Sequence, residues 1–310
     1  MGKRAKISVI CAGNVGASCA QRLAEKGFAD VVMLDIVEGL PQGKALDIQE
    51  SAPINGFDSS ITGTNDYKDT ADSDIVVITS GAARKPGMTR DDLLKINMKI
   101  ISDVTENVVR YSPDCIIMIA TNPVDAMVYL ALQVSKFPRN RVMGLSGVLD
   151  GGRLRTFIAE ELKVSVQNIT ACVLGEHGKS MVVLPRLTMV DGVPLTQLLP
   201  QEKIDALIAR TVGGGAEIVG LLKTGSAFYA PSAALASMAE AVITDSNRIL
   251  GCGALLDGEY GIKDTVLDVP VKLNRNGIEQ IIELELNEKE KEQLQESAKA
   301  VQGLIKAMKP

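Results

Sequence analysis

The chain has 310 residues, of which 46% are hydrophobic and 23% are charged, and its net charge at neutral pH is -5. This length allows two domains, and the composition is that of a globular protein, neither disordered nor fibrous. The acidic balance argues against a general nucleic-acid-binding protein, because binding phosphates requires a dense basic surface.

The cysteine spacing and the hydropathy of the chain predict in which cellular compartment the protein is found. The five cysteines are scattered and never form a Cys-x-x-Cys pair; they are Cys11, Cys19, Cys115, Cys172 and Cys252. This pattern is typical of reduced cytosolic thiols and not of a disulfide framework or a zinc site. No apolar stretch reaches the roughly 18 residues that a membrane helix needs. We therefore expect a cytoplasmic protein without a metal site or a membrane partner.

Four short apolar runs dominate the first half of the chain. They are Ile7–Cys11, Val31–Leu34, Ile75–Ile78 and Ile116–Ile119. Strands that are buried on both faces have this composition, so the runs predict the centre of a parallel sheet. Helix-like segments lie between them, one of them 91–109. The alternation predicts a doubly wound, Rossmann-type α/β domain with ligands at the carboxyl ends of its strands.

A dinucleotide-binding fingerprint follows the first run. Its residues are Cys11, Ala12, Gly13, Asn14, Val15 and Gly16. Gly13 would let a pyrophosphate approach the backbone at a helix N-terminus, and Gly16 would let that helix pack closely on the sheet. A signal peptide is the alternative for this basic and apolar N-terminus, but the apolar run is short and glycine interrupts it.

Asp35 ends the second run, about 20 residues after the fingerprint, where a carboxylate is expected to bind the adenosine ribose. The same carboxylate would repel a 2′-phosphate, so the sequence favours NAD over NADP. A plain turn residue at a strand end is the alternative.

Two further strand ends carry polar side chains. Residues 81–90 form a loop with three cations, including Arg84 and Arg90, which either folds over an anionic substrate or is simply a solvated basic loop. Asn122 precedes Pro123 after the fourth run, where it either bonds to a ligand or forms a turn that redirects the chain.

The pattern changes after residue 147, where strand-like runs become shorter and helices longer. We therefore divide the chain into a nucleotide-binding domain, 1–147, and a mixed α+β substrate domain, 148–310. The helix expected at 148–162 carries Asp150 and Arg153 on one face, either as an ordinary ion pair or as part of a site. Its two glycines, Gly151 and Gly152, suggest close approach by another group.

The only histidine of the chain, His177, lies between two glycines after a strand expected at 169–174. Histidine exchanges a proton near neutral pH, so this residue is a candidate acid and base, although a lone histidine can also be structural. Ser226 follows a helix with three central glycines, 213–215. Long helices are expected at 229–250 and 287–308, the second one amphipathic.

Together these motifs resemble the lactate/malate dehydrogenase family along essentially the whole chain, and most of all its bacterial malate dehydrogenases that are similar to lactate dehydrogenases. The matching pieces, in chain order, are Ala12 to Gly16, Asp35, Arg84 with Arg90, Thr121-Asn122-Pro123, Leu149-Asp150 with Arg153, Gly175-Glu176-His177-Gly178 and Leu222 to Ala227.

This resemblance implies a role for each catalytic and substrate-binding residue. His177 would exchange the hydroxyl proton of the substrate, and Asp150 would hold the other ring nitrogen. Arg153 would bind the C1 carboxylate in a two-pronged manner, which lysine cannot do. Arg90 would polarise the C2 carbonyl, and Asn122 would orient the same oxygen before a cis peptide bond at Pro123. Ser226 would also contact the substrate.

Arg84 would set the substrate, because the family carries arginine here for malate and generally glutamine for lactate. A second carboxylate without a counter-charge would cost several kcal/mol, about 3–5, once buried. The resemblance therefore implies reversible NAD-dependent oxidation of malate to oxaloacetate. The implied cofactor residues are Cys11, Ala12, Gly13, Asn14, Val15, Gly16, Asp35, Thr79, Gly81, Asn97, Thr121 and Asn122.

Two residues depart from the family's pattern. Cys11 replaces a glycine, so we expect a strained turn, modestly weaker NAD binding and sensitivity to oxidants. Lys179 stands where relatives often have an acid, and its charge is expected to lower the pKa of His177.

Three alternative functions remain. The chain could act on lactate or another 2-hydroxy acid, it could bind a dinucleotide without catalysis, or it could be a cysteine hydrolase using Cys172 and His177. Relatives associate through helical faces, so we expect a homodimer or homotetramer.

Overall fold

A nine-stranded sheet forms the centre of the computed structural model, which describes residues 4–82 and 90–308. Six of its strands are parallel and follow the order β3-β2-β1-β4-β5-β6, which is the order of a doubly wound dinucleotide-binding fold. The predicted fold class and the four predicted central strands are confirmed. The six strands are β1 (Ala5–Ile10), β2 (Ala29–Leu34), β3 (Ile61–Thr64), β4 (Ile75–Ile78), β5 (Ile116–Ile119) and β6 (Val142–Leu145).

Three antiparallel strands from the second half extend the same sheet beyond β6. They are β12 (Ile249–Asp257), β13 (Lys263–Asn274) and β14 (Gly277–Ile281). The expectation that strands become shorter in this half is confirmed for five two-residue strands between residues 169 and 194, but it is wrong for β12 and β13, which are the two longest strands described. Glycine and proline interrupt the apolar pattern of these two strands, so the sequence did not predict them. A Cβ at Gly251 would lie 3.0 Å from the Cα of Gly147, so close packing against a neighbour requires glycine in β12.

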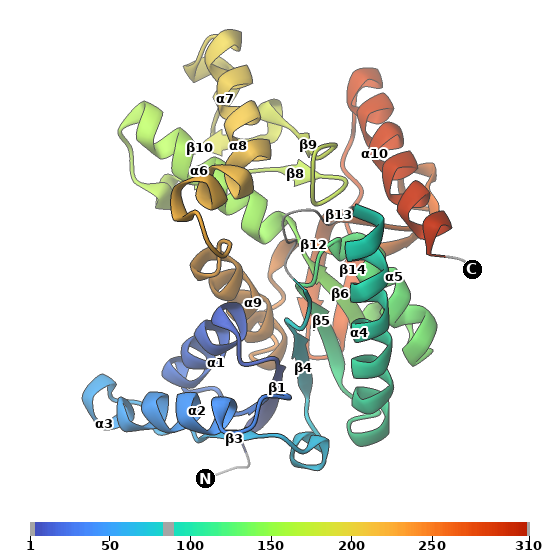
Figure 1. The fold of residues 1–310 in the computed structure, drawn as a ribbon. Coiled ribbons are helices and arrows are strands. Elements are labelled where there is room, and N and C mark those ends of the chain that lie inside the picture. Colours follow the sequence, from blue (N-terminus) through green and yellow to red (C-terminus); the bar gives the residue numbers. More distant parts are fainter. Residues whose placement is uncertain (1–3, 83–89, 309–310) are drawn as a thin grey trace.

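Helices cover both faces of the sheet (Figure 1). The first-half helices are α1 (Asn14–Lys26), α2 (Leu40–Glu50), α3 (Ala52–Asn55), α4 (Arg90–Tyr111) and α5 (Val124–Ser135). The second-half helices are α6 (Gly147–Leu162), α7 (Leu195–Leu198), α8 (Gln201–Leu222), α9 (Tyr229–Ile243) and α10 (Glu288–Ala307). Short 3-10 turns are η1 (Tyr67–Thr70), η2 (Arg139–Arg141), η3 (Val166–Asn168), η4 (Pro185–Leu187) and η5 (Glu259–Gly261).

The alternation of side chains along each strand divides the core into two layers. In β4, Ile75 and Val77 pack with α1 and α9, whereas Val76 and Ile78 pack with α4 and α5. Because successive side chains of a strand point to opposite faces, a strand buried on both sides needs an unbroken apolar run. This requirement explains why these strands could be identified from the sequence.

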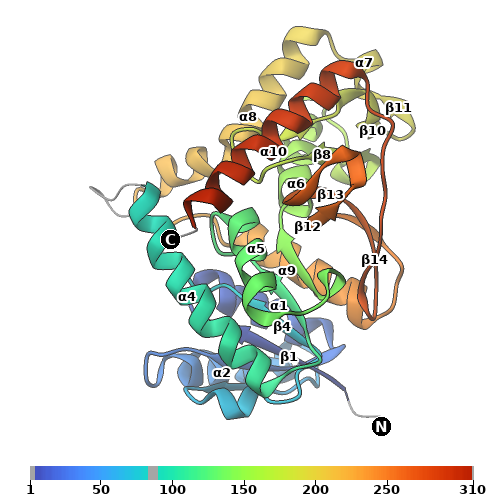
Figure 2. The same ribbon diagram turned by 90° about the vertical axis from the view of Figure 1, so that its right-hand side faces the viewer.

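A smaller lobe lies beyond the sheet and holds α6, α7, α8 and five two-residue strands (Figure 2). These strands are β7 (Ile169–Thr170), β8 (Val173–Leu174), β9 (Val182–Val183), β10 (Met189–Val190) and β11 (Val193–Pro194). Leu154 and Ile158 of α6 pack with Ile204 and Leu207 of α8 to form the core of this lobe.

Two predicted elements of the second half need correction. The single strand expected at 169–174 is two strands, because β7 pairs with β10 whereas β8 pairs with β9. The helix expected at 229–250 ends at Ile243, and Ile249 and Leu250 begin β12. Asp245 and Asn247 adopt positive φ just after α9, and this left-handed backbone stops the helix.

Within the residues that the structure describes, no helix is long and apolar enough to cross a membrane. The same residues contain no cluster of three or more potential metal ligands. All five cysteines are free thiols.

Candidate active site

Asp150 lies between the two other charged groups that the sequence analysis placed in a site. Its Oδ2 is 2.6 Å from His177 Nδ1, and its Oδ1 accepts a hydrogen bond of 2.8 Å from Arg153 Nη1. The side chain of Asp150 is only 1% exposed, so both bonds form away from water. The first turn of α6 supplies Asp150, its second turn supplies Arg153, and the loop after β8 supplies His177.

The contact with Asp150 fixes the state of the imidazole. An ionised carboxylate only accepts hydrogen bonds, so Nδ1 of His177 carries a proton and Nε2 is left to take up or release one. Burial lowers the pKa of His177, but the charge and hydrogen bond of Asp150 raise it more, and the net pKa lies above the ordinary value. The lowering expected from Lys179 is therefore wrong. Lys179 is exposed, and the carboxylates outweigh the cationic neighbours of the ring.

Arg153 keeps hydrogen-bond donors that no described residue uses. Its Nε is buried and has no hydrogen-bond partner among the described residues, although the same guanidinium binds Asp150 through Nη1. An unpaired buried donor on a charged group is costly, and a carboxylate ligand would remove that cost. Arg153 is therefore suited to bind an anionic substrate beside His177.

Two glycines of α8 make room for Arg153. A Cβ at Gly214 would lie 3.1 Å from Arg153 Cδ, and a Cβ at Gly215 would lie 3.5 Å from Nη2. The close approach that we expected at Gly151 and Gly152 is found here instead. A Cβ at Gly151 would lie at an ordinary 3.8 Å from the Cβ of Ala171, and one at Gly152 would meet no described residue within 4 Å. The central glycines of α8 thus belong to the site.

The strand ends of the first half join the same region through α5. The peptide bond between Asn122 and Pro123 is cis, as the resemblance implies. Asp125 follows in the first turn of α5, and its Oδ2 accepts a hydrogen bond of 2.9 Å from the backbone N–H of His177. Asp125 was not singled out from the sequence, because an acid in the first turn of a helix is common for electrostatic reasons alone.

Asn97 of α4 holds the base of the strand-end loops. Its Oδ1 accepts a hydrogen bond of 2.8 Å from the N–H of Ala82, and its Nδ2 donates one of 2.7 Å to the carbonyl of Asn122. Thr121 in turn donates to the carbonyl of Ser80 over 2.5 Å. A Cβ at Gly81 would lie 2.6 Å from Thr121 Cγ2, so the two strand ends are in close contact.

Residues of the fingerprint form a cradle at the carboxyl end of β1. Gly13 precedes α1, and no side chain of the described residues caps the first N–H groups of this helix. A Cβ at Gly16 would lie 1.9 Å from the carbonyl oxygen of Cys11, which explains why only glycine fits there. Thr79 bonds to the carbonyls of Ile10 and Cys11 over 3.2 and 3.3 Å. Uncapped N–H groups beside an open loop fit a pyrophosphate.

Asp35 and Lys44 brace this cradle from its sides. Asp35 accepts hydrogen bonds from the N–H of Ala12 over 2.6 Å and from the N–H of Val37 over 3.0 Å. Lys44 of α2, which the sequence analysis missed, donates to the carbonyl of Ala12 over 2.8 Å. Asp35 thus stands at the position that an adenosine ribose would require, and the residues present fit a dinucleotide.

Cys11 adopts φ of 89°, the left-handed region that favours glycine. The turn is therefore strained, as the replacement of glycine predicts. Burial raises the pKa of the Cys11 thiol. A raised pKa lowers the thiolate fraction, which argues against the oxidant sensitivity that we expected.

The cysteine hydrolase alternative finds no support at Cys172. Burial raises the pKa of its thiol to about 12. A catalytic cysteine needs a low pKa, because the thiolate is the nucleophile. His177, which would have to activate this cysteine, forms its hydrogen bond with Asp150 of α6 instead.

The structure gives no side-chain contact for four predicted substrate-binding residues, Arg84, Arg90, Asn122 and Ser226, and Asn122 takes part only through its carbonyl. Arg84 lies outside the described residues. Arg90 begins α4, but its side chain also lies outside them. Ser226 is exposed in the turn after α8. Their roles stay predictions.

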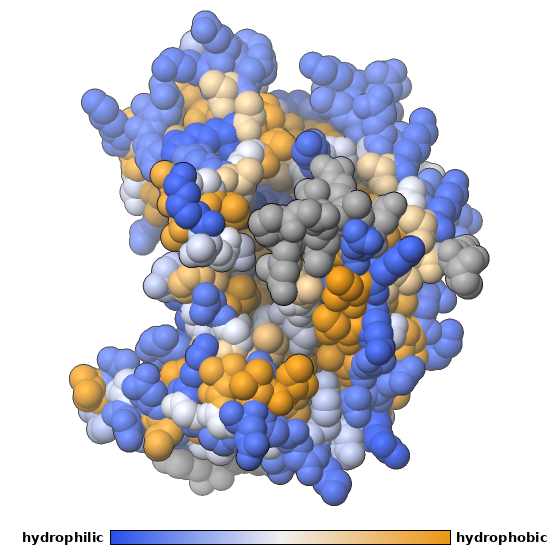
Figure 3. All heavy atoms as spheres, viewed as in Figure 1, coloured by the Kyte–Doolittle hydropathy of each residue, from blue (hydrophilic) through white to orange (hydrophobic). Residues whose placement is uncertain are grey.

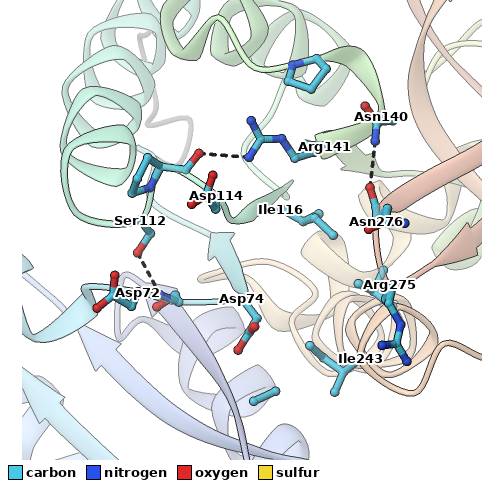
Figure 4. A pocket seen from close by; sticks show the side chains of 15 residues that line it. Asp72, Asp74, Ser112, Asp114, Ile116, Asn140, Arg141, Ile243, Arg275 and Asn276 are labelled. Carbon is cyan, nitrogen blue, oxygen red and sulfur yellow. Dashed lines mark hydrogen bonds between the residues drawn. The ribbon is translucent and has the colours of Figure 1, made fainter.

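A recess of about 690 Å³ lies at the opposite edge of the sheet, where β1 and β5 begin (Figure 4). Its polar groups bond to one another: Arg141 Nη1 donates to the carbonyl of Pro113 over 3.0 Å, and Asn140 Nδ2 donates to that of Asn276 over 2.9 Å. Parallel sheets bind ligands at the carboxyl ends of their strands. This recess is therefore not part of the candidate active site.

Comparison with known proteins matches the whole chain. The model for the NAD-binding domain of lactate/malate dehydrogenases matches residues 5–144, and the model for their alpha/beta C-terminal domain matches residues 147–309. A malate dehydrogenase of Dehalococcoides mccartyi is 61% identical over 303 residues, which cover 98% of this chain and 99% of that protein.

Solved structures show the same similarity to lactate and malate dehydrogenases. The structure of malate dehydrogenase from Salinibacter ruber is similar with a TM-score of 0.94 at 51% identity, over 98% of this chain and 97% of that one. The lactate dehydrogenase of Cryptosporidium parvum, solved with lactic acid and NAD, is similar with a TM-score of 0.96 at 40% identity, over the full length of both chains. Both activities thus occur on this fold, so the fold alone does not separate them.

The glycines of α8 provide a direct test of how the side chain of Arg153 is positioned. Gly214→Ala should raise KM for the anionic substrate by about 10-fold, because displacing a positioning residue weakens binding. Gly213→Ala is the matched control, since a Cβ there meets none of the atoms that the structure describes within 4 Å. Both changes should favour the helix by up to about 1 kcal/mol. Equal KM values in the two variants would contradict the role of Gly214.

Asp268 of β13 gives a pH-dependent test. Burial raises the pKa of this carboxyl well above its usual range, and the charges of Asp150 and Asp125 raise it further. The folded protein therefore keeps a proton that the unfolded chain releases above about pH 4, so this group's contribution to stability falls as pH rises.

Asp268→Asn removes that proton exchange. The free energy of unfolding of the variant relative to the wild type should increase by up to about 1.4 kcal/mol per pH unit between pH 5 and 7. Urea denaturation at several pH values measures it, with the exposed Asp47→Asn as the control. If the curves of Asp268→Asn and the wild type ran parallel, Asp268 would not carry the proton.

Proposed function

The chain belongs to the lactate/malate dehydrogenase family, and from that premise we propose how its residues carry out the reversible, NAD-dependent oxidation of (S)-malate to oxaloacetate. One observation supports the assignment of roles above all others. The carboxylate of Asp150 holds a proton-exchanging imidazole on one oxygen and a guanidinium with a free buried donor on the other. A 2-hydroxy acid carries its hydroxyl group on C2 and its carboxylate on the adjacent C1, so its oxidation requires a proton acceptor and a carboxylate-binding group side by side.

His177 moves the proton of the reaction. With Nδ1 bonded to Asp150, its Nε2 accepts the hydroxyl proton of malate as the C2 hydrogen leaves as hydride. In the reverse direction the protonated ring returns a proton to the C2 oxygen. Asp150 stabilises the imidazolium that oxidation forms, and the raised pKa of His177 keeps more of the ring protonated for reduction.

Arg153 binds and orients the substrate. Its guanidinium grips the C1 carboxylate with N–H groups that do not bind Asp150. Asn122 orients the C2 oxygen, Arg90 polarises the carbonyl of oxaloacetate, and Ser226 adds a contact from the end of α8. These positions are supported by the match to the family's motifs.

NAD, when bound, supplies the hydride chemistry by accepting hydride at its nicotinamide ring or returning it. Gly13, Asn14, Val15 and Gly16 would hold the pyrophosphate at the start of α1. Asp35 would bind the adenosine ribose and repel the 2′-phosphate of NADP. The strand ends that would border the nicotinamide half are shaped by Asn97, Thr79, Gly81 and Thr121.

Arg84 is proposed to select malate over lactate. Oxaloacetate carries a second carboxylate that would be buried without a counter-charge if glutamine replaced arginine. The high identity to malate dehydrogenases supports the same choice. A lactate dehydrogenase or a dinucleotide-binding protein without catalysis remains the alternative outcome of the test below.

We also propose a cytoplasmic homo-oligomer, a dimer or tetramer, in which the division of the chain at residue 147 separates a nucleotide-binding half from a substrate half. Apolar side chains gather around α2 (Figure 3). Leu46 of α2 is 60% exposed, Ile54 of α3 is 84% exposed and Leu221 of α8 is 77% exposed. Such helical faces are suited to bury one another between copies of the chain. Partners other than the small substrate, such as nucleic acid or a membrane, are not proposed.

Substrate choice tests this function. The wild type should reduce oxaloacetate faster than pyruvate at matched concentrations, with NADH preferred over NADPH. Arg84→Gln should lower kcat/KM for oxaloacetate by about 10²–10³-fold, because the distal carboxylate loses its counter-charge.

Lys85→Gln removes the next charge in the sequence and serves as the control, with kcat/KM for oxaloacetate changed less than about 3-fold, because the matching motif contains Arg84 and Arg90 but not Lys85. Faster reduction of pyruvate by the wild type would overturn the assignment of malate. Failure to consume NADH with either substrate would favour a protein without catalysis.

A further inference from the structure

Ser297 is an unusual residue on the inner face of α10. The apolar stripe of this helix consists of Leu294, Ala298, Val301 and Ile305, all buried. Ser297 is 0% exposed within the same face. A buried hydroxyl is unfavourable unless it finds hydrogen-bond partners, so its contacts explain its presence.

These contacts lie in the loop that carries His177. The Oγ of Ser297 accepts a hydrogen bond of 2.7 Å from the backbone N–H of Glu176, and it lies 3.3 Å from the Oγ of Ser180. Ser180 also donates to the carboxylate of Glu176. The serine of the C-terminal helix therefore bonds to the residue directly before the histidine.

Successive backbone groups of this loop are held by three different elements. The N–H and C=O of Gly175 bond to the backbone of Asp268 in β13 over 3.0 and 2.7 Å. The N–H of Glu176 bonds to Ser297 in α10, and the N–H of His177 bonds to Asp125 in α5. The backbone of 175–177 is thus fixed residue by residue, and α10 supplies the central bond.

The approach of α10 to the loop is close. Gly175 has φ of 91°, and a Cβ there would lie 2.6 Å from Ser297 Oγ. The helix itself is firmly placed. Asn287 and Glu290 form a capping box at its start, and Glu290 forms an ion pair of 2.8 Å with Arg186. A rigid helix is a suitable support for a positioning group.

We propose that Ser297 is a positioning residue, through which the C-terminal helix holds the backbone of Glu176 and so keeps the imidazole of His177 against Asp150. Ser297 touches neither substrate nor cofactor. The inference rests on the proposed role of His177 and extends the functional machinery to a helix that the sequence analysis described only as amphipathic.

Ser297→Ala tests the proposal. Its kcat should fall by about 10- to 100-fold, because small displacements of a reacting group have effects of this size. The Kd for NADH should stay unchanged, since the cradle at β1 lies on other elements. The pKa of His177, which is the only histidine and can be followed by NMR, should fall toward its ordinary value as the contact with Asp150 loosens.

Ser112→Ala is the matched control. Ser112 is 1% exposed, accepts a hydrogen bond of 3.1 Å from the N–H of Ser73 and donates one of 2.8 Å to Thr70, far from the loop. It should lose stability without a change in kcat or in the pKa of His177. If Ser297→Ala does not fold, Ser297→Cys provides the same test, because a thiol fills the space but accepts hydrogen bonds weakly.

The proposal is overturned if the Ser297 variant matches Ser112→Ala in both kcat and the pKa of His177. The titration also separates this failure from that of the proposed function. A wild type that does not turn over oxaloacetate would contradict the function, whereas the shift in the histidine pKa between the wild type and Ser297→Ala would still decide the role of Ser297.

Discussion

The two hydrogen bonds of Asp150 are the interaction on which the site depends. A carboxylate that is 1% exposed must be satisfied by strong partners, and it has two, His177 on one oxygen and Arg153 on the other. The same bonds fix the tautomer of the histidine, raise its pKa and aim the guanidinium. Arg153 follows Asp150 by one helical turn, so the geometry between proton acceptor and carboxylate grip is set by the rigid start of α6.

The rest of the structure supports this arrangement from several directions. The glycines of α8 pack closely against Arg153. Asp125 of α5 accepts a hydrogen bond from the backbone N–H of His177, and the backbone of β13 bonds to Gly175. Buried acids have a cost. The pKa of Asp125 is raised to about 7, because the effect of burial outweighs the lowering by the charge of His177 and by the hydrogen bond from its backbone. The site thus gathers negative charge around one imidazole, which favours the protonated ring.

Sequence reasoning predicted the features that depend on local pattern. The runs of β1, β4 and β5 were visible because both faces are buried, and Asp35, Asp150 and His177 lie in recognisable motifs. It missed features set by distant contacts. Gly251 and Pro270 disguise β12 and β13, although the glycine is needed for packing against Gly147.

Supporting residues were hidden for the same reason. Ser297 meets Glu176 across 121 positions of sequence, and Asp125 meets His177 across 52. Nothing near either residue in the sequence marks such a contact. Lys179 shows the opposite error, in which closeness in sequence was taken to imply an effect. This residue lies two positions after His177, but its side chain is exposed and does not set the pKa of the histidine.

The most direct test of the account is an NMR titration of His177, which needs no assignment because the chain contains no other histidine. The wild type should titrate with a pKa above the ordinary value of about 6.5, and Asp150→Asn should lower it, because the charge that stabilises the imidazolium is removed. A wild-type pKa at or below about 6.5, or one that Asp150→Asn leaves unchanged, would contradict the central role of Asp150.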